Sequence, residues 1–298
     1  MASEPFNVWS YASQVNDVDA VNSHWFKTTE GIILIDTQRL LPEAERALEH
    51  LRHNTNASVV AIIITHAHTD HYGGLPVWKT AFPEARIFTD ETTLRSIRSD
   101  ARGYIARRQK THGARFANHE DLKAAVAEGF VETVENGEQI KIGNVTLEFE
   151  VVGPSEAEAT TIVYLPEEDV LFSGDLVNVL TPAVPLEDLN AWFEQLNEIE
   201  KQFPNATIYQ GHGPAPAPRD AVAEQLNFLN RLKRLVVEKV TDKRLDESEV
   251  EEIVLTLESE FPFYQGVAGQ TRREIFAFDA GIVAEQMGAK VDGEGAEL

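Results

Sequence analysis

Three histidines and one aspartate stand within six residues, in the stretch THAHTDH that ends at His71. They follow the apolar, β-branched run 59–64, which is typical of a buried strand. On a strand or a helix, His66, His68, Asp70 and His71 could not all face one way, but on a loop they can converge on two neighbouring points. Imidazoles and carboxylates together suit Zn, Mn or Fe. The cluster therefore predicts a metal site; the alternative is a polar surface loop.

Composition limits the chemistry that the rest of the chain can supply. The 298 residues contain no cysteine, which excludes disulfides, thiolate nucleophiles and cysteine-based zinc sites. The net charge of -23 repels polyanions, so we expect a small-molecule substrate and no nucleic acid as partner. Without a long apolar run or a secretory signal pattern, we expect a soluble, cytoplasmic protein with no membrane partner. A homodimer is an open alternative.

Residue patterns predict strands and helices in alternation around the cluster. Glu30-Gly31 marks a turn between two short strands within 25–37, and Gly143-Asn144 marks a hairpin. Further strands are expected at 59–64, 85–88, 138–142, 145–152, 161–165, 170–172 and 207–209. Helices are expected at 41–54, 73–81, 186–203, 219–242, 246–259 and 271–287, with a helical polar region over 91–127. We expect the tail 288–298 to be disordered.

The spacing H-x-H-x-D-H strongly resembles the signature of the metallo-β-lactamase-fold superfamily, in its glyoxalase II and lactonase-like branch. LIDT at 34–37, SGD at 173–175 and GHG at 211–213 look like further elements of that family, in matching order over roughly 20–215. The resemblance implies an α/β (α+β) fold, a four-layer αβ/βα sandwich with its metal site at one edge. We expect a catalytic domain over 1–217 and a C-terminal helical extension over 218–298.

The resemblance also implies ligands for two divalent ions, with zinc expected and manganese or iron as alternatives. One ion would be bound by His66, His68 and Glu156 and the other by Asp70, His71 and His212, with Asp175 bridging them. Glu156 lies in GPSEAEAT at 153–160, where the family usually has His. Glu158 is the rival ligand, and both could instead be solvated loop acids. Asp36 either orients a ligand or caps a turn.

Glu156 changes the charge of the site if it is a ligand. Three carboxylates and one hydroxide would balance two divalent ions, where a neutral His would leave one positive charge. A less positive centre acidifies its water less and attracts an anionic transition state less. The extra oxygen ligand also moves the preference from zinc toward manganese or iron.

A basic stretch at 95–115 holds seven Lys or Arg and a single Asp. It is either a solvated helix or a lid from which Arg107, Arg108 or Arg115 steers a carboxylate- or phosphate-bearing substrate. Tyr104 is an aromatic candidate for the pocket wall.

Core packing explains Tyr104 and a second aromatic candidate, Trp25, equally well. The histidines outside the motifs are expected to be surface residues rather than ligands: His24, His50, His53, His112 and His119.

By resemblance, the chemistry is that of a metal-dependent hydrolase. A hydroxide held between two cations attacks a carbonyl, one ion stabilises the oxyanion, and Asp70 passes a proton to the leaving group. The expected substrate is an ester, thioester or lactone of a small, anionic molecule. Two alternatives stay open: a mononuclear-iron persulfide dioxygenase, and a catalytically weak ligand-binding or regulatory member of the fold.

Overall fold

A six-stranded sheet forms one half of the molecule, in the order β1-β2-β3-β4-β5-β6. The computed structural model describes residues 6–13, 21–266 and 270–292. The strands are Val8–Ala12, Asn22–Lys27, Ile32–Ile35, Val59–Ile63, Arg86–Thr89 and Val131–Thr133. The first three are antiparallel, whereas β3 to β6 run parallel. β3 is buried throughout and β4 at all but one residue, as their continuous Ile, Val and Leu content predicts.

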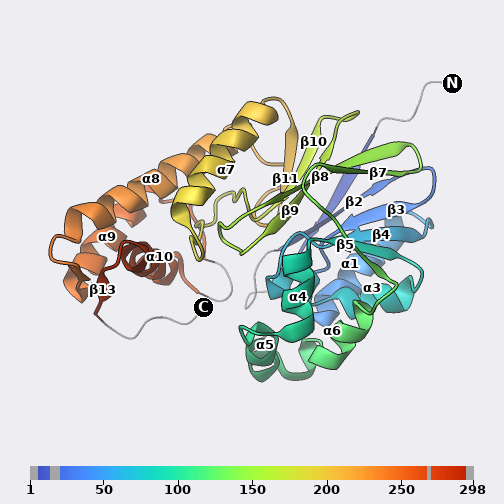
Figure 1. Ribbon diagram of the computed structural model, residues 1–298, viewed down its shortest axis with the longest axis horizontal. Coiled ribbons are helices and arrows are strands. Elements are labelled where there is room, and N and C mark those ends of the chain that lie inside the picture. Colours follow the sequence, from blue (N-terminus) through green and yellow to red (C-terminus); the bar gives the residue numbers. More distant parts are fainter. Residues whose placement is uncertain (1–5, 14–20, 267–269, 293–298) are drawn as a thin grey trace.

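A five-stranded sheet, in the order β11-β10-β9-β8-β7, packs against the first (Figure 1). Its strands are Glu138–Ile142 (β7), Val145–Val152 (β8), Thr160–Leu165 (β9), Val170–Gly174 (β10) and Thr207–Gln210 (β11). β10 and β11 are parallel and the other pairs antiparallel. Apolar side chains from both sheets meet between them, and the rings of Phe26 and Phe172 stack with centroids 5.5 Å apart.

Helices cover the outer face of each sheet. Those on the first sheet are α1 (Leu41–Asn54), α3 (Leu75–Ala81), α4 (Glu91–Ser99), α5 (Tyr104–His112) and α6 (His119–Ala125), and the short α2 (Thr69–Tyr72) precedes α3. Those on the second side are α7 (Leu189–Gln202), α8 (Ala221–Lys239), α9 (Glu247–Glu260) and α10 (Arg272–Gln286). The predicted four-layer sandwich is confirmed. Among the described residues, no helix is long and apolar enough to cross a membrane.

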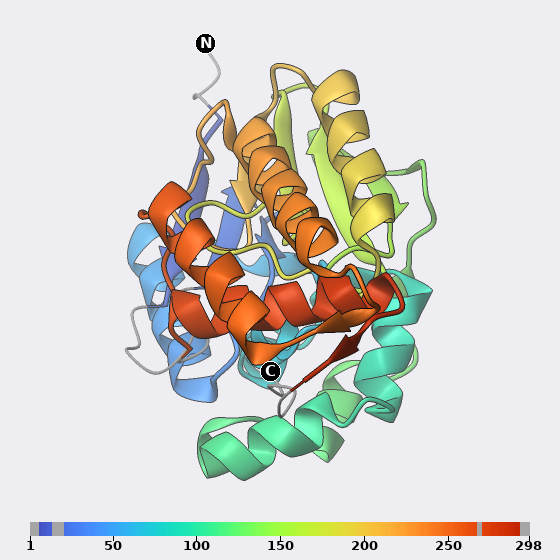
Figure 2. The same ribbon diagram turned by 90° about the vertical axis from the view of Figure 1, so that its left-hand side faces the viewer.

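The C-terminal helices share a core with the second sheet. Buried residues of α8, α9 and α10 form one cluster with α7 and with Leu171 of β10. α10 runs across the direction of α7 and α8 (Figure 2). Near its end, Gln286 donates a hydrogen bond to the Pro185 carbonyl and accepts one from the Leu189 amide. The boundary expected between 217 and 218 stays a prediction.

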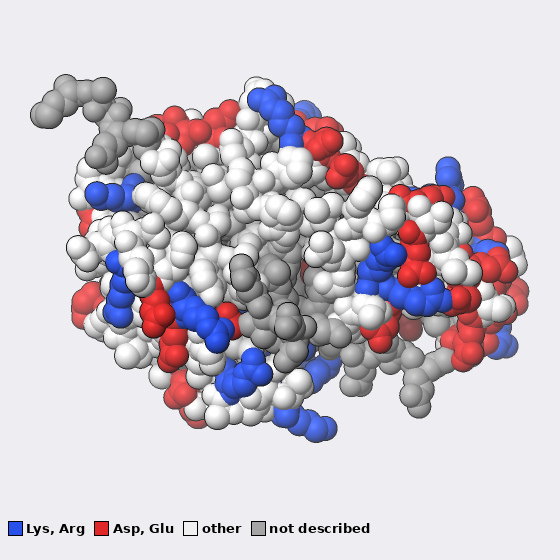
Figure 3. Space-filling model, turned by 180° about the vertical axis from the view of Figure 1, so that it is seen from behind, with Lys and Arg blue, Asp and Glu red and all other residues white. Residues whose placement is uncertain are grey.

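Ion pairs cover the outer surface of these helices. Acidic and basic side chains gather over them on the face shown in Figure 3. One of the ion pairs of these helices is the bidentate pair of Arg231 with Glu260. Such exposed pairs contribute little stability individually, so the helices depend on their shared apolar core.

The structure corrects several predicted elements. The predicted helix 186–203 begins at Leu189, because the Asp188 carboxylate accepts hydrogen bonds from the first free amides. The prediction that the chain is disordered from residue 288 is wrong for Lys290–Val291. These residues form β13, which pairs with β12 (Arg244–Leu245). The rest of that tail, 293–298, lies outside the described residues. β1 and β6 were not predicted, because each is short and only partly buried.

Candidate metal centre

The chemistry-bearing residues follow strand ends that meet at one edge of the sandwich. Asp36 follows β3, and His66 stands three residues after its parallel neighbour β4. In the other sheet, Asp175 follows β10 and His212 follows the parallel β11. Because parallel strands end at the same edge of a sheet, both pairs come together, as the sequence predicts.

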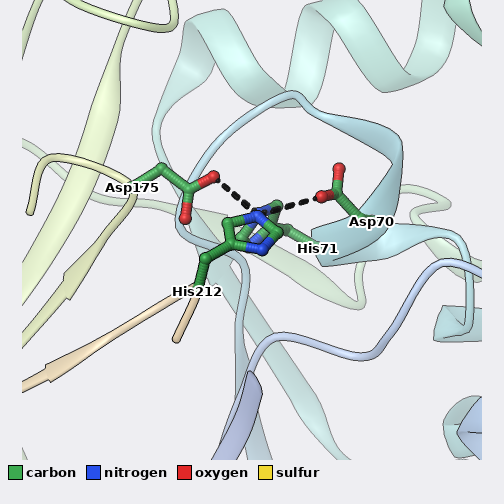
Figure 4. A group of neighbouring side chains, drawn as sticks. All are labelled: Asp70, His71, Asp175 and His212. Carbon is green, nitrogen blue, oxygen red and sulfur yellow. Dashed lines mark hydrogen bonds and ion pairs between the residues drawn. The ribbon is translucent and has the colours of Figure 1, made fainter. Parts of the chain in front are cut away.

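Two groups of donor atoms lie at this edge. One consists of Asp70, His71, Asp175 and His212, and the other of His66, His68 and Asp175; within each, the donor atoms lie within 4.8 Å of one another. In Figure 4 the Asp70 and Asp175 carboxylates approach the imidazoles of His71 and His212 from opposite sides. Asp175 belongs to both groups, so the arrangement can hold two neighbouring cations.

In the first group, the imidazole nitrogens and carboxylate oxygens lie close enough together to bind one ion. His212 Nε2 lies 3.2 Å from Asp70 Oδ2 and 3.1 Å from Asp175 Oδ2. His71 Nε2 lies 3.2 Å from the same Asp175 oxygen. All four side chains are buried. A divalent cation is the species that this convergence of carboxylates and imidazoles fits best.

Asp36 fixes the orientation of two histidines. Its carboxylate accepts hydrogen bonds from His71 Nδ1 at 2.7 Å, from the Thr65 amide at 2.9 Å and from the Thr65 hydroxyl at 2.8 Å. Since the Thr65 hydroxyl donates to Asp36, its oxygen accepts from His66 Nδ1 at 3.0 Å. The Nε2 lone pairs of His66 and His71 are then left to face the centre. Asp36 therefore orients two candidate ligands rather than only capping a turn.

Buried polar atoms without partners test whether a metal fits. Among the described residues, His66 Nε2 and Asp175 Oδ1 are buried and make no hydrogen bond. Such orphaned atoms are costly unless something absent from the protein chain binds them. Gly211 leaves room beside Asp175, because a Cβ there would lie 2.0 Å from Asp175 Oδ1. The residues present therefore fit a cation.

The electrostatics of the imidazoles agree with this. Burial, with the neighbouring imidazoles, holds the pKa of His66 well below its usual value, and burial lowers the pKa of His68 to about 4. Burial alone would also lower those of His71 and His212, but nearby carboxylates, Asp175 foremost, raise the pKa of both well above the ordinary value. The first pair is neutral and ready to bind a metal, whereas the second pair lies where positive charge is favoured.

The structure separates the two candidate glutamates. Glu156 Oε1 lies 3.8 Å from His68 Nδ1, and its other oxygen accepts a hydrogen bond from Asn178 at 3.3 Å. Glu158 is exposed and forms an ion pair of 2.6 Å with Arg102. Glu156 therefore borders the centre, although it lies outside both compact donor groups, and Glu158 does not.

Supporting residues that sequence reasoning missed come from distant segments. Asn22 donates to the carbonyls of Gln210 and Gly213 at 3.0 and 2.9 Å and so holds the turn that carries His212. His24 donates to the Gln210 carbonyl at 2.9 Å, and burial lowers its pKa to about 4. The prediction of His24 as a surface residue is therefore wrong, because β2 packs directly against the end of β11.

Arg39 was also missed. Its guanidinium lies 3.2 Å from Asp70 Oδ1, and both side chains are buried. The sequence offered no sign of this pair, because Arg39 precedes an ordinary helix start and stands 31 positions before Asp70.

A cavity of about 180 Å³ opens beside His68. Tyr104 lines it, as predicted, together with Arg95, Ser96, Ser99 and Arg102. The three arginines predicted to steer the substrate are not among the described residues that line it: Arg107, Arg108 and Arg115. Trp25 is buried in the core under the first sheet and is no pocket wall.

The fold and this centre define a protein class. A family model described as the metallo-beta-lactamase superfamily matches residues 16–240, and the chain belongs to that superfamily.

Known proteins resemble the chain at low identity. An (R)-specific secondary-alkylsulfatase from Pseudomonas sp is 24% identical over 231 residues, which are 68% of this chain and 35% of that protein. A type 2 metallo-beta-lactamase from Bacillus sp. (strain 170) is 26% identical over 191 residues, which are 62% and 64% of the two chains. A metallo-beta-lactamase family protein from Thermus thermophilus shares the fold, with a TM-score of 0.64 and 21% identity over 94% of each chain. The chain spans about a third to two thirds of the length of these curated relatives.

Proposed function

We propose that the protein is a metal-dependent hydrolase that acts on an ester, thioester or lactone of a small, anionic molecule. The observation that carries the proposal is the pair of donor groups sharing Asp175 at the edge of the sandwich. In the proposed assignment, His66, His68 and Glu156 hold one divalent ion, Asp70, His71 and His212 hold the other, and Asp175 bridges. Zinc is the first candidate metal, and the carboxylate-rich set also suits manganese or iron.

Two bound ions would supply an acidified water as nucleophile and stabilise the oxyanion that its attack produces. The protein's own contribution is to fix the donors: Asp36 sets the tautomers of His66 and His71, and Asn22 holds the turn of His212. Asp70 directs Oδ2 into the centre, where its carboxylate can accept a proton and pass it to the leaving group.

We assign the remainder of the substrate to the cavity beside His68. Its volume of about 180 Å³ suits a short acyl chain or a compact head group. Glu158 and Glu187 are both bound to Arg102. Arg95 makes no ion pair with the residues described, so it is the lining cation left to bind a substrate carboxylate.

Sulfate esters form a second candidate substrate class. The observation that favours them is the similarity to an alkylsulfatase over two thirds of this chain. A sulfate monoester is also small and anionic, and it fits the same requirement for a cation near the reacting group.

Metal content together with hydrolysis tests the proposal. Protein purified without added metal should contain about two ions per chain by mass spectrometry, and it should hydrolyse part of a panel of carboxylic esters, thioesters, lactones and sulfate esters. Glu156→Ala should lose about one ion, whereas the matched control Glu158→Ala should keep both, because Glu158 pairs with Arg102 at the surface.

Other results would favour the alternatives. A single iron with thiol-dependent oxygen uptake would indicate a persulfide dioxygenase. Full metal occupancy without turnover of any panel member would indicate a binding or regulatory protein. Unchanged metal content in Glu156→Ala would remove Glu156 from the ligand set.

A further inference from the structure

The donor groups concentrate negative charge in a small buried volume. Asp36, Asp70 and Asp175 are each at most 5% exposed, and Glu156 borders the same space. Four carboxylates balance two divalent ions completely, before any substrate or water contributes charge. A centre with no net positive charge would hold its metals tightly, but it would do little to attract an anion.

A buried guanidinium enters this cluster. Arg39 lies 3.2 Å from Asp70 Oδ1. The other Asp70 oxygen lies 3.2 Å from His212 Nε2. The carboxylate is thus divided, with one oxygen toward Arg39 and one toward the centre. Although burial opposes ionisation, Arg39 and His71 hold the pKa of Asp70 well below its usual range.

The segment that carries Arg39 is fixed against the segment that carries the ligands. The Thr37 amide donates to the His71 carbonyl at 2.8 Å, and the Gly74 amide donates to the Gln38 carbonyl at 2.7 Å. The approach is close enough that a Cβ at Gly73 would lie 2.2 Å from the Arg39 carbonyl oxygen. Arg39 is therefore held at a set position rather than reaching in from a mobile loop.

We propose that Arg39 makes the loaded centre one unit of charge more positive, which favours anions. The inference rests on the two-metal assignment proposed above. It predicts opposite effects of Arg39 on the binding of metal cations and on the binding of anions. Arg39 weakens cation binding by repulsion and strengthens the binding of an anionic substrate or inhibitor by attraction.

The first test measures both affinities without turnover. We expect Arg39→Gln to retain two ions, to hold them about tenfold more tightly against a competing chelator, and to bind inorganic phosphate about tenfold more weakly. Arg39→Lys, which keeps the charge, should stay near the wild type in both. Circular dichroism confirms that each variant is folded.

A second-site variant gives an independent test. Glu156→His replaces an anionic donor with a neutral one, so by itself it should weaken metal binding and strengthen phosphate binding. The double variant Arg39→Gln/Glu156→His should return toward the wild type in both measurements.

If Arg39 only supports packing, Arg39→Gln and Arg39→Lys will both lose metal, and Glu156→His will make the loss worse; that result overturns the inference. Wild-type protein without two metals would instead refute the two-metal assignment itself.

Discussion

At the residue scale, a single carboxylate organises much of the centre. The Asp36 carboxylate accepts a hydrogen bond directly from His71 and, through the Thr65 hydroxyl, determines which nitrogen of His66 carries its proton. Its backbone has a φ of 57°, which is uncommon for a residue with a side chain. The position is demanding, because a longer or uncharged side chain could not make all three contacts.

Asp36→Asn should therefore reduce metal affinity by roughly 10- to 100-fold, because one acceptor oxygen is replaced by a donor and the histidine tautomers are no longer fixed. Chelator competition on the purified variant measures this. Asp90→Asn is the matched control: Asp90 also follows a buried strand, but it caps α4 through the Thr93 amide and touches no candidate ligand. Equal loss of metal in both variants would contradict the role of Asp36.

The sequence indicated the donors but only part of what supports them. The candidate ligands between His66 and His71 stand within six residues of one another, and Asp175 and His212 each follow an apolar run. Each could therefore be recognised from the residues next to it in the sequence. Asn22 and Arg39 have no such signal. Their roles arise only when segments up to about 190 positions apart come into contact, as Asn22 does with Gly213.

At the element scale, the sequence predicted that the basic stretch 95–115 borders the site, but it pointed to the wrong arginines within that stretch. Helix geometry decides which side chains face the cavity: Arg95 and Ser99, four positions apart on α4, share one face. On α5, the Arg107 guanidinium lies over the Tyr104 ring, with 5.9 Å to its centroid. The sequence predicted where the helices lie along the chain. Which face of each helix is turned toward the cavity could be seen only in the folded structure.

Arg95→Gln should raise KM roughly fivefold for a carboxylate-bearing ester. It should leave kcat almost unchanged, as well as the KM of neutral esters. The expected effect is small because Arg95 is exposed, and exposed ion pairs are weak. Steady-state kinetics on matched charged and neutral substrates measures the difference. Arg107→Gln is the control and should behave as wild type. The reverse ranking of the two variants would restore the assignment made from the sequence.

At the scale of the whole molecule, the centre joins the two halves of the sandwich. Its donors come from β4 and α2 on one side and from the ends of β10 and β11 on the other. A metal bound to donors from both sides would therefore resist separation of the two sheets. Most strands and helices could be predicted from the sequence, because continuous apolar runs and helical periodicity are local properties. The four layers came from the resemblance to the superfamily, and the short edge strands were missed.

Removal of metal should lower the melting temperature by about 5 to 10 °C, if the metals are present at roughly 100 times their Kd. Thermal unfolding with and without a chelator measures the change. Asp175→Ala, which removes the shared donor, should already melt at a lower temperature and respond little to the chelator. An equal response in the variant would show that the chelator acts elsewhere.

A buried carboxyl group on α10, that of Asp279, makes the stability of the fold depend on pH. It is fully buried on α10, and neither of its carboxylate oxygens has a hydrogen-bond partner among the described residues. Burial raises its pKa well above the ordinary value of 3.8. Above pH 3.8 the unfolded chain releases this proton while the folded chain retains it, so the folded state loses stability as pH rises toward its own, higher pKa.

Asp279→Asn should accordingly gain stability relative to the wild type as pH rises from about 4 to 8, by about 1 to 3 kcal/mol at the upper end. Urea unfolding at several pH values measures it. Glu285→Gln, an exposed acid on the same helix, provides the control. A constant difference between Asp279→Asn and the wild type at all pH values would contradict the buried proton.

The contacts of Gln286 bear on how the chain can be shortened. This side chain of α10 binds the backbone at Pro185 and at Leu189, where the segment that leads from Asp175 enters α7. A truncation made to isolate the metal-binding half would remove that anchor together with most of a shared core. The last helices share their core and these hydrogen bonds with the second sheet and its loops, so a fusion partner or affinity tag belongs beyond them rather than in their place.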